Sequence, residues 1–268
     1  MEIKKKPSNC DALYVVGFPK SGNTWLARLI ADITQSNIST SNEQDVVNAV
    51  DNSKQRKGRF TVYKLHQDEK SNLPSEEKIV YIIRDVRDVL VSAFFFNNNF
   101  VKQSWVLASN TTLMGKFWRF YYNHQTRRMN KRWRGNEFSS ILNIIHGQKE
   151  IIGDWSEHVR KWANRPNTIV VKYEDLLHQP EVELKRILLD FGLEIDDETI
   201  SQSISNQSFS ARKSDFTQSG DKTNARFLRS GRVGDWKMFN IAKITREIEE
   251  HHQEVMKLYD YEMEFMEK

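Results

Sequence analysis

The sequence lacks the features that cross-link a protein covalently or hold it in a membrane. Cys10 is its only cysteine, so no disulfide can form within the chain, and a reducing compartment is expected. No apolar run approaches the roughly 20 residues that a membrane-spanning helix needs. The basic residues 1–7 are not followed by the apolar segment of a signal peptide. We therefore expect a cytoplasmic protein with no transmembrane segment.

Acidic residues are absent from one long window of the chain. Residues 89–136 contain no Asp or Glu, although the formal charge of the whole chain is only +4. The basic residues of this window are Lys102, Lys116, Arg119, Arg127, Arg128, Lys131, Arg132 and Arg134. They fit either the solvated face of an amphipathic helix or a basic, helical lid around residues 97–152 that attracts an anionic partner. The sequence leaves both alternatives open.

Spacings typical of metal sites are also missing. His251 and His252 are adjacent, so on a helix their side chains point about 100° apart and form a poor metal pair. No zinc-type spacing of His and Cys occurs elsewhere in the sequence. We expect no metal.

Strand and helix patterns alternate along the chain. Residues 34–59 are polar and are expected to form a loop around one short helix near residues 44–50. The alternation predicts an α/β fold with a central parallel sheet and crossover helices, in a single domain over residues 1–268. The predicted strands are residues 13–16, 60–66, 78–83 and a run that begins at Thr168, and the predicted helices are residues 24–33, 181–191 (closed by Gly192) and 241–259.

The first predicted strand ends in a glycine-rich loop that opens a helix. This order puts backbone N–H groups at the positive end of a helix dipole, where a phosphate-like anion binds. In the nucleotide-triphosphate loop G-x-x-x-x-G-K-[ST], the positions of Gly17, Gly22 and Thr24 match. Asn23 stands where the lysine should be, and the cation is Lys20, inside the loop. The loop therefore predicts an anion site but disfavours Mg-ATP.

Residues 19–25, Pro-Lys-Ser-Gly-x-Thr-Trp, resemble the 5′-phosphosulfate loop of sulfotransferases that use 3′-phosphoadenosine 5′-phosphosulfate (PAPS). The resemblance implies a P-loop-like three-layer fold and PAPS as donor, with adenosine 3′,5′-bisphosphate (PAP) as product. It also implies that Lys20 and the loop N–H groups neutralise charge on the leaving 5′-phosphate. The donor-binding residues implied in this loop are Lys20, Ser21, Gly22, Asn23, Thr24 and Trp25.

The second predicted strand ends in Lys64-Leu65-His66. A lone histidine at a strand end is ordinarily a surface residue. The tripeptide is similar, however, to the Lys-x-His that follows the second strand of cytosolic sulfotransferases. An acceptor hydroxyl must lose its proton as it attacks sulfur, and imidazole suits that task. The resemblance thus implies His66 as general base and Lys64 as a catalytic cation near the sulfuryl group.

The third predicted strand delivers Arg84 at its carboxyl end, where ligands of open α/β sheets bind. The charges from Arg84 to Asp88 could simply cap the helix that follows. Yet R-x-x-R-D-x-x-x-S, from Arg84 to Ser92, resembles the 3′-phosphate motif of the same family, in which the arginine and the serine hold the phosphate. A planar guanidinium binds phosphate through two hydrogen bonds, which supports this role.

Later segments complete the resemblance. The motif H-V-x-x-W is followed by a strand and Tyr173, which implies packing beside the adenine of the donor. We expect Trp155, Trp162 and His158 to be packing residues.

Two more segments near the C-terminus resemble parts of the donor site. Ser208 and Phe209 resemble a segment that lines the adenine, and Arg229, Ser230 and Gly231 resemble the loop R-K-G-x-x-G-D-W-K that binds the 3′-phosphate. Ser230 replaces the expected lysine, whose charge Arg226 or Arg232 could supply.

These patterns predict a PAPS-dependent sulfotransferase that transfers its group directly to a hydroxyl or amine, without a covalent intermediate. A small-molecule, carbohydrate or glycolipid acceptor is expected, and the basic window favours an anionic or carbohydrate hydroxyl over a phenol. One alternative is a nucleotide or small-molecule kinase with a variant phosphate loop. Another is a non-enzymatic binder of nucleic acid or an anionic surface, which is disfavoured because no nucleic-acid-binding module accompanies the basic residues.

Overall fold

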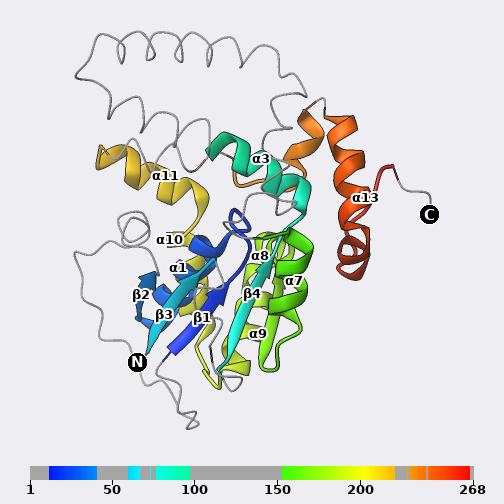
Figure 1. Ribbon diagram of the computed structural model, residues 1–268. Coiled ribbons are helices and arrows are strands. Elements are labelled where there is room, and N and C mark those ends of the chain that lie inside the picture. Colours follow the sequence, from blue (N-terminus) through cyan, green and yellow to red (C-terminus); the bar gives the residue numbers. More distant parts are fainter. Residues whose placement is uncertain are drawn as a thin grey trace, which may run out of the picture.

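The computed structural model describes residues 12–40, 60–66, 73, 77–96, 153–220, 228, 230–239 and 241–265 (Figure 1). The described strands form one sheet in the order β2-β3-β1-β4-β5, and every neighbouring pair is parallel. They are β1 (Ala12–Val16), β2 (Asn37–Thr40), β3 (Thr61–Leu65), β4 (Ile79–Ile83) and β5 (Thr168–Lys172). The predicted α/β fold with a central parallel sheet is confirmed.

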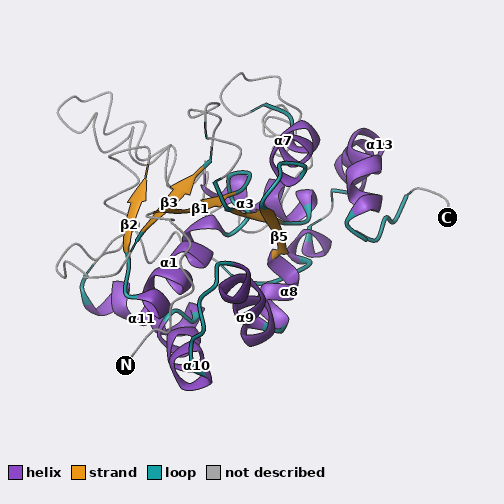
Figure 2. Ribbon diagram, turned by 90° about the horizontal axis from the view of Figure 1, so that it is seen from below, coloured by secondary structure: helices purple, strands orange, loops and turns teal. Residues whose placement is uncertain are grey.

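Helices cover both faces of this sheet, which gives three layers (Figure 2). On one face, α3, α7 and α13 pack against alternate residues of β1 and β4, such as Val16 and Tyr81. On the other face, α1, α8, α9 and α10 pack against the intervening residues, such as Val15 and Ile82. The helices are α1 (Asn23–Thr34), α3 (Val86–Phe96), α7 (Trp155–Ala163), α8 (Tyr173–His178), α9 (Pro180–Asp190), α10 (Asp197–Asn206), α11 (Phe209–Gln218) and α13 (Ala242–Leu258), with a short 3₁₀ helix η2 (Asp235–Met238).

The central strands β1 and β4 are buried on both faces because helices cover both sides. All five residues of β4 are buried, which explains its continuous apolar sequence. The register sets Val16 of β1 beside Leu65 of β3 and Tyr81 of β4. The carboxyl ends of these three strands therefore meet at one edge of the sheet, and the segments that follow them lie together there.

Two local details test the sequence predictions. Gly192 has φ of 68° and follows Phe191, the C-cap of α9, and the N–H of Leu193 bonds to the carbonyl of Leu188, so the predicted glycine closure of this helix is confirmed. The expected loop over residues 34–59 is wrong at Asn37–Thr40, which form the edge strand β2. Its residues are mostly polar, and it pairs with β3 alone, so no apolar alternation marks it in the sequence. Among the described helices, none has the length and apolar character required to cross a bilayer.

Candidate active site

The loop between β1 and α1 is shaped to present backbone N–H groups. Its last residue, Gly22, is the N-cap of α1 and has φ of 107°. Glycine has no side chain that could cap the helix, so the first N–H groups of α1 face the loop. A Cβ atom at this position would lie 2.7 Å from Cδ2 of Tyr173. Both the backbone angle and this close approach require glycine.

Asn23, at the position of the usual phosphate-loop lysine, is bound to two backbone carbonyls. It is 2% exposed, and its Nδ2 donates to the carbonyl of Gly17 at 2.7 Å and to that of Leu65 at 3.3 Å. These two carbonyls belong to the ends of β1 and β3. The side chain therefore joins two strand ends and leaves no cation at the lysine position.

His66 follows β3 directly, and its ring lies against this junction. Nδ1 of His66 is 3.0 Å from Nδ2 of Asn23 and 3.4 Å from the carbonyl oxygen of Gly17. The first neighbour is a donor and the second an acceptor, so they favour opposite tautomers. A ring that takes up a proton at Nε2 must carry its own proton on Nδ1, and the Gly17 carbonyl is the acceptor for it.

His158 of α7 holds the backbone of His66. Nε2 of His158 lies 2.9 Å from the His66 carbonyl oxygen, and Nδ1 lies 2.9 Å from the Tyr81 hydroxyl. Burial lowers the pKa of His158 to about 4, partly opposed by the hydrogen bond to His66. At neutral pH the imidazole is uncharged. The expectation that His158 is only a packing residue therefore omitted its hydrogen bond to His66.

Arg84 bridges two loops at the end of β4. Nη1 donates to the carbonyl of Lys20 at 3.3 Å, and Nη2 donates to that of Arg232 at 3.0 Å. The guanidinium also lies over the ring of Tyr173, with Cζ 4.2 Å from the ring centroid. Arg84 is 7% exposed. One side chain therefore connects the phosphate loop with the later loop that contains Arg232.

Asp88 fixes the same later loop from α3. Its carboxylate accepts from the N–H of Gly234 at 2.8 Å and that of Trp236 at 3.1 Å, and it lies 3.6 Å from Nη2 of Arg84. Burial raises the pKa of Asp88, and Arg84 partly offsets that effect. The sequence marked Asp88 only as part of a charged motif. Its two contacts to backbone N–H groups, almost 150 residues away, are not visible in that pattern.

Tyr173, which is expected beside the adenine, and the segment before Ser208 both contact Trp25 of the phosphate loop. The rings of Trp25 and Tyr173 are 5.8 Å apart, and Nε1 of Trp25 donates to the carbonyl of Gln207 at 3.1 Å. A Cβ atom at Gly231 would lie 2.8 Å from Cδ2 of Phe209. The structure thus brings these aromatic residues and the loop of Gly231 next to the phosphate loop.

The other residues expected at the site have positions that do not by themselves indicate a role. Lys20 Nζ lies 4.1 Å from the centroid of Phe96, and Lys64 is buried on β3. Ser92 is half-buried on α3, and Thr24 is half-buried in the first turn of α1.

The expected site residues of the later segments have contacts of their own. Ser208 caps α11 through the N–H of Ala211, and Ser230 donates to Asp235. Arg229 and Arg226, like the basic window beyond Phe96 and the lid at 97–152, lie outside the described residues.

Two buried polar atoms at this edge fit an anionic ligand. Within the described residues, neither Oγ of Ser21 nor Nε of Arg84 has a hydrogen-bond partner. Ser21 is fully buried, and leaving such a group unpaired costs about 1–3 kcal/mol. Both atoms are donors, as a phosphate or sulfate group would require.

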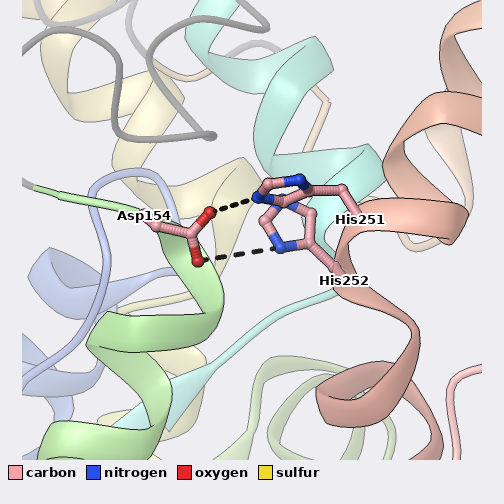
Figure 3. A group of neighbouring side chains, drawn as sticks. All are labelled: Asp154, His251 and His252. Atoms are coloured by element: carbon pink, nitrogen blue, oxygen red, sulfur yellow. Dashed lines mark hydrogen bonds and ion pairs between the residues drawn. The ribbon is translucent and has the colours of Figure 1, made fainter.

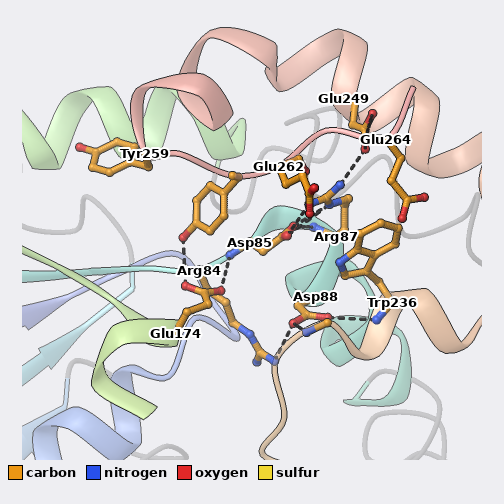
Figure 4. A network of polar contacts seen from close by, with 12 residues as sticks. Arg84, Asp85, Arg87, Asp88, Glu174, Trp236, Glu249, Tyr259, Glu262 and Glu264 are labelled. Atoms are coloured by element: carbon orange, nitrogen blue, oxygen red, sulfur yellow. Dashed lines mark hydrogen bonds and ion pairs between the residues drawn. The ribbon is translucent and has the colours of Figure 1, made fainter. Parts of the chain in front are cut away.

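A second polar network anchors α3 to the C-terminal segment (Figure 4). Arg87 donates to Asp85 at 2.7 Å, to Glu249 at 2.7 Å and to the carbonyl of Glu262 at 2.7 Å. Glu249 also accepts from the N–H groups of Glu264 and Phe265. Burial by itself lowers the pKa of Arg87, but Asp85 and Glu249 raise it above its ordinary value. The network is structural and supports α3, which carries Asp88.

A third cluster joins the start of α7 to α13 (Figure 3). Asp154 caps α7 through the N–H of Glu157 and lies 2.8 Å from Nε2 of His251 and 3.9 Å from Nδ1 of His252. Nδ1 of His252 is 2.8 Å from the hydroxyl of Ser156. The expectation that adjacent histidines diverge was wrong, since their potential ligand atoms and that of Asp154 lie within 4.8 Å of one another. These direct contacts connect the N-terminal end of α7 to α13 through hydrogen bonds.

Comparisons with known proteins agree on one family. A family model described as the sulfotransferase domain matches residues 11–263. Sulfotransferase 2A1 of Mus musculus is 26% identical over 250 residues, which cover 84% of this chain and 77% of that protein. The 3-beta-hydroxysteroid sulfotransferase of Cavia porcellus is 26% identical over 274 residues, or 91% and 83% of the two chains.

Two solved structures of similar fold contain PAP. Mouse sulfotransferase SULT7A1 complexed with PAP superimposes with a TM-score of 0.61 and 20% identity, covering 93% of this chain and 85% of that one. Retinol dehydratase in complex with androsterone and inactive cofactor PAP gives a TM-score of 0.59 and 18% identity, covering 97% and 84%. At these identities the likeness shows the fold.

Proposed function

This chain belongs to the sulfotransferase family, and we propose that it transfers the sulfuryl group of PAPS directly to a hydroxyl or amine of a small acceptor, with His66 as general base. The observation that carries this assignment is the junction of Gly17, Asn23 and His66. It joins the start of the phosphate loop to the ring of the histidine through contacts of 2.7–3.4 Å. The base and the loop therefore have a fixed relative position.

The donor would be held by the loop and its neighbours, and it supplies the group that is transferred. The N–H groups at the start of α1 and the Lys20 ammonium would neutralise charge on the 5′-phosphate, the electrostatic contribution that usually dominates such catalysis. Arg84 retains N–H donors beyond those it gives to two carbonyls, including the unpaired Nε. We assign the 3′-phosphate to Arg84, Ser92, Arg229, Ser230 and Gly231, and the adenine to Trp25, Tyr173, Ser208 and Phe209.

His66 would accept the proton of the acceptor group at Nε2. This role needs the tautomer with its proton on Nδ1, for which the Gly17 carbonyl at 3.4 Å is the acceptor. The imidazolium that forms keeps the same hydrogen bond. Lys64, buried on β3 two residues before His66, would place a positive charge close to the transferring group.

The acceptor is proposed as a small molecule with a free hydroxyl. The names of two relatives refer to hydroxysteroids and retinol. The basic window of residues 89–136 instead favours a carbohydrate, glycolipid or other anionic hydroxyl compound. Because Cys10 is the only cysteine, we further propose that the protein acts in the reducing cytoplasm.

A kinase with a variant loop is the less favoured function. It would need a lysine at the position of Asn23, whose amide is instead bound to Gly17 and Leu65. We propose no metal for the transfer reaction, because Lys20 and the N–H groups of the phosphate loop would supply the positive charge at the 5′-phosphate.

Calorimetric titration with PAP, beside ATP and Mg²⁺ in the same buffer, tests the donor assignment. We expect binding of PAP that is lost when the 3′-phosphate is removed, and no response to ATP. Release of PAP from PAPS in the presence of steroid, phenol and sugar alcohols would then identify the acceptor. A preference for Mg-ATP would overturn the proposal in favour of a kinase.

A further inference from the structure

We propose that Tyr81 and His158 are positioning residues of the transfer reaction, forming a buried hydrogen-bonded chain that fixes the backbone of His66 relative to the phosphate loop. The inference rests on the proposed role of His66 as general base. Neither side chain belongs to the donor-binding set. Both act through His66.

The first step concerns the strand that carries the base. The ladder between β1 and β3 ends with the pair of Val16 and Leu65, so His66 is the first residue beyond it. Its carbonyl oxygen accepts a hydrogen bond from Nε2 of His158 at 2.9 Å. This contact extends the fixed part of the chain by the one residue that bears the catalytic ring.

The second step gives the direction of the hydrogen bonds. A carbonyl oxygen can only accept, so Nε2 of His158 carries the proton. In the neutral ring Nδ1 is then an acceptor, and the hydroxyl of Tyr81 donates to it at 2.9 Å. The neutral state is secured by burial, because the pKa of His158 is lowered to about 4. The tautomer of His158 is thus determined by its two partners.

The third step connects this chain to the phosphate loop. Phe18 lies two residues before Lys20, between the end of β1 and the start of α1. The ring of Phe18 packs edge-on against the imidazole of His158, with 5.5 Å between centroids. The hydrogen-bonded side chains of Tyr81 and His158 therefore pack against the loop that would hold the 5′-phosphate, and they end at the residue that would accept the proton.

Burial makes the chain dependent on these particular side chains. Tyr81 is fully buried, Phe18 is 2% exposed and His158 is 6% exposed. Water therefore cannot readily replace a missing donor. Removing one link leaves the His66 carbonyl free to shift, and a displacement of about 1 Å in a catalytic group can lower a rate about 100-fold.

A packing role for His158 makes a different prediction. If only shape mattered, any side chain of similar size would serve. If the hydrogen bond matters, the replacement must place an N–H where Nε2 lies. His158→Gln keeps such a donor, whereas His158→Asn ends near the position of Nδ1 and His158→Leu has no donor. Tyr81→Phe removes only the hydroxyl at the start of the chain.

The experiment compares these four variants with the wild-type protein. PAP affinity is measured by calorimetry, thermal stability by unfolding, and the position of the His66 ring by the NMR signal of its Cε1–H group, assigned with His66→Gln. Turnover of PAPS is measured with the most active compound from the acceptor screen, or with water. We expect PAP affinity to stay within about twofold in every variant, because the donor residues are untouched.

We expect the His66 signal to move in His158→Asn, His158→Leu and Tyr81→Phe, and to return toward the wild-type position in His158→Gln. The rate should fall about 10–100-fold in the first three variants, with KM for PAPS unchanged, and should lie within about fivefold of wild type in His158→Gln. A wild-type His66 signal and rate in folded His158→Asn would overturn the inference. Normal turnover by His66→Ala would instead overturn the proposed function, and the NMR result would still stand by itself.

Discussion

The side-chain amide of Asn23 lies 3.0 Å from Nδ1 of His66, although 43 residues separate them in the sequence. The same amide bonds to the carbonyls of Gly17 and Leu65. A residue in the place of the phosphate-loop lysine is thus used to join the loop to the proposed base. Compared with a nucleotide-triphosphate loop, this loop lacks the lysine charge, and the residue at that position forms structural contacts with Gly17, Leu65 and His66 instead.

The first prediction concerns His66. In His66→Ala the proposed proton acceptor is removed, and turnover of PAPS should fall by about 10²–10⁴-fold. PAP should still bind, because the substitution leaves Arg84 and the N–H groups of the phosphate loop in place. Calorimetry and a turnover assay on the same preparation measure both. A normal rate would remove His66 from the reaction.

The sequence predicts motifs of neighbouring residues at this site, but it does not predict contacts between residues that are far apart in the chain. The loop of Lys20 and Gly22 and the strand end at His66 are local patterns, and the structure places both at one sheet edge. The contact of Asn23 with His66 depends on the register of β1 with β3, which no local pattern specifies. The chain from Tyr81 through His158 needs three elements to be packed before its groups meet.

The charged motif after β4 shows the same limit. Its spacing predicts Arg84 at the carboxyl end of a strand, and Arg84 directly follows β4. The role of Asp88 depends on backbone N–H groups of Gly234 and Trp236, which carry no side-chain signature. A sequence can identify a charged residue more readily than the backbone group that it binds.

The second prediction concerns Arg84. Arg84→Ala removes the guanidinium between the two loops, and we expect PAP affinity to fall by at least about tenfold, the equivalent of one or more charge-assisted hydrogen bonds. Arg84→Lys should recover little of the PAP affinity, because a single ammonium lacks the planar set of donors with which a guanidinium can bind two carbonyls and a phosphate. Arg186→Ala, at an exposed position on α9, is the control. Wild-type affinity in Arg84→Ala would exclude Arg84 from the donor site.

The third prediction concerns Gly22. In Gly22→Ala the new Cβ would meet the ring of Tyr173 at 2.7 Å while φ is 107°. The variant should lose about 1–3 kcal/mol of stability and bind PAP more weakly. Gly220→Ala separates the two causes, since Gly220 also has positive φ but no atom within 4 Å of a Cβ. Denaturant unfolding of both variants gives the comparison, and equal losses would mean that the contact with Tyr173 contributes nothing.

The fourth prediction concerns the buried pair of Arg87 and Glu249. Glu249→Gln puts an NH₂ group, which cannot accept, in place of one of the two oxygens that bind Arg87 and the N–H groups of Glu264 and Phe265. Because Asp85 still pairs with Arg87, the change should cost about 1–3 kcal/mol in the free energy of unfolding. Glu254→Gln removes a carboxylate that lies 2.6 Å from Arg160 on the surface, and this change should cost less than about 1 kcal/mol. Urea unfolding measures both. Similar values for the two variants would contradict the assigned importance of the network.

The fifth prediction concerns pH and His158. Because burial lowers the pKa of His158 from 6.5 to about 4, the unfolded chain binds more protons than the folded one between these values. The stability from this group is therefore complete above about pH 6.5 and is lost as the pH falls toward 4, by up to about 1.4 kcal/mol per unit. His158→Gln cannot titrate, so its stability should fall less steeply over this window than that of the wild type. Unfolding in urea at several pH values within the window measures the slopes, and parallel curves for wild type and His158→Gln would show that His158 is protonated as readily in the folded protein as in the unfolded chain.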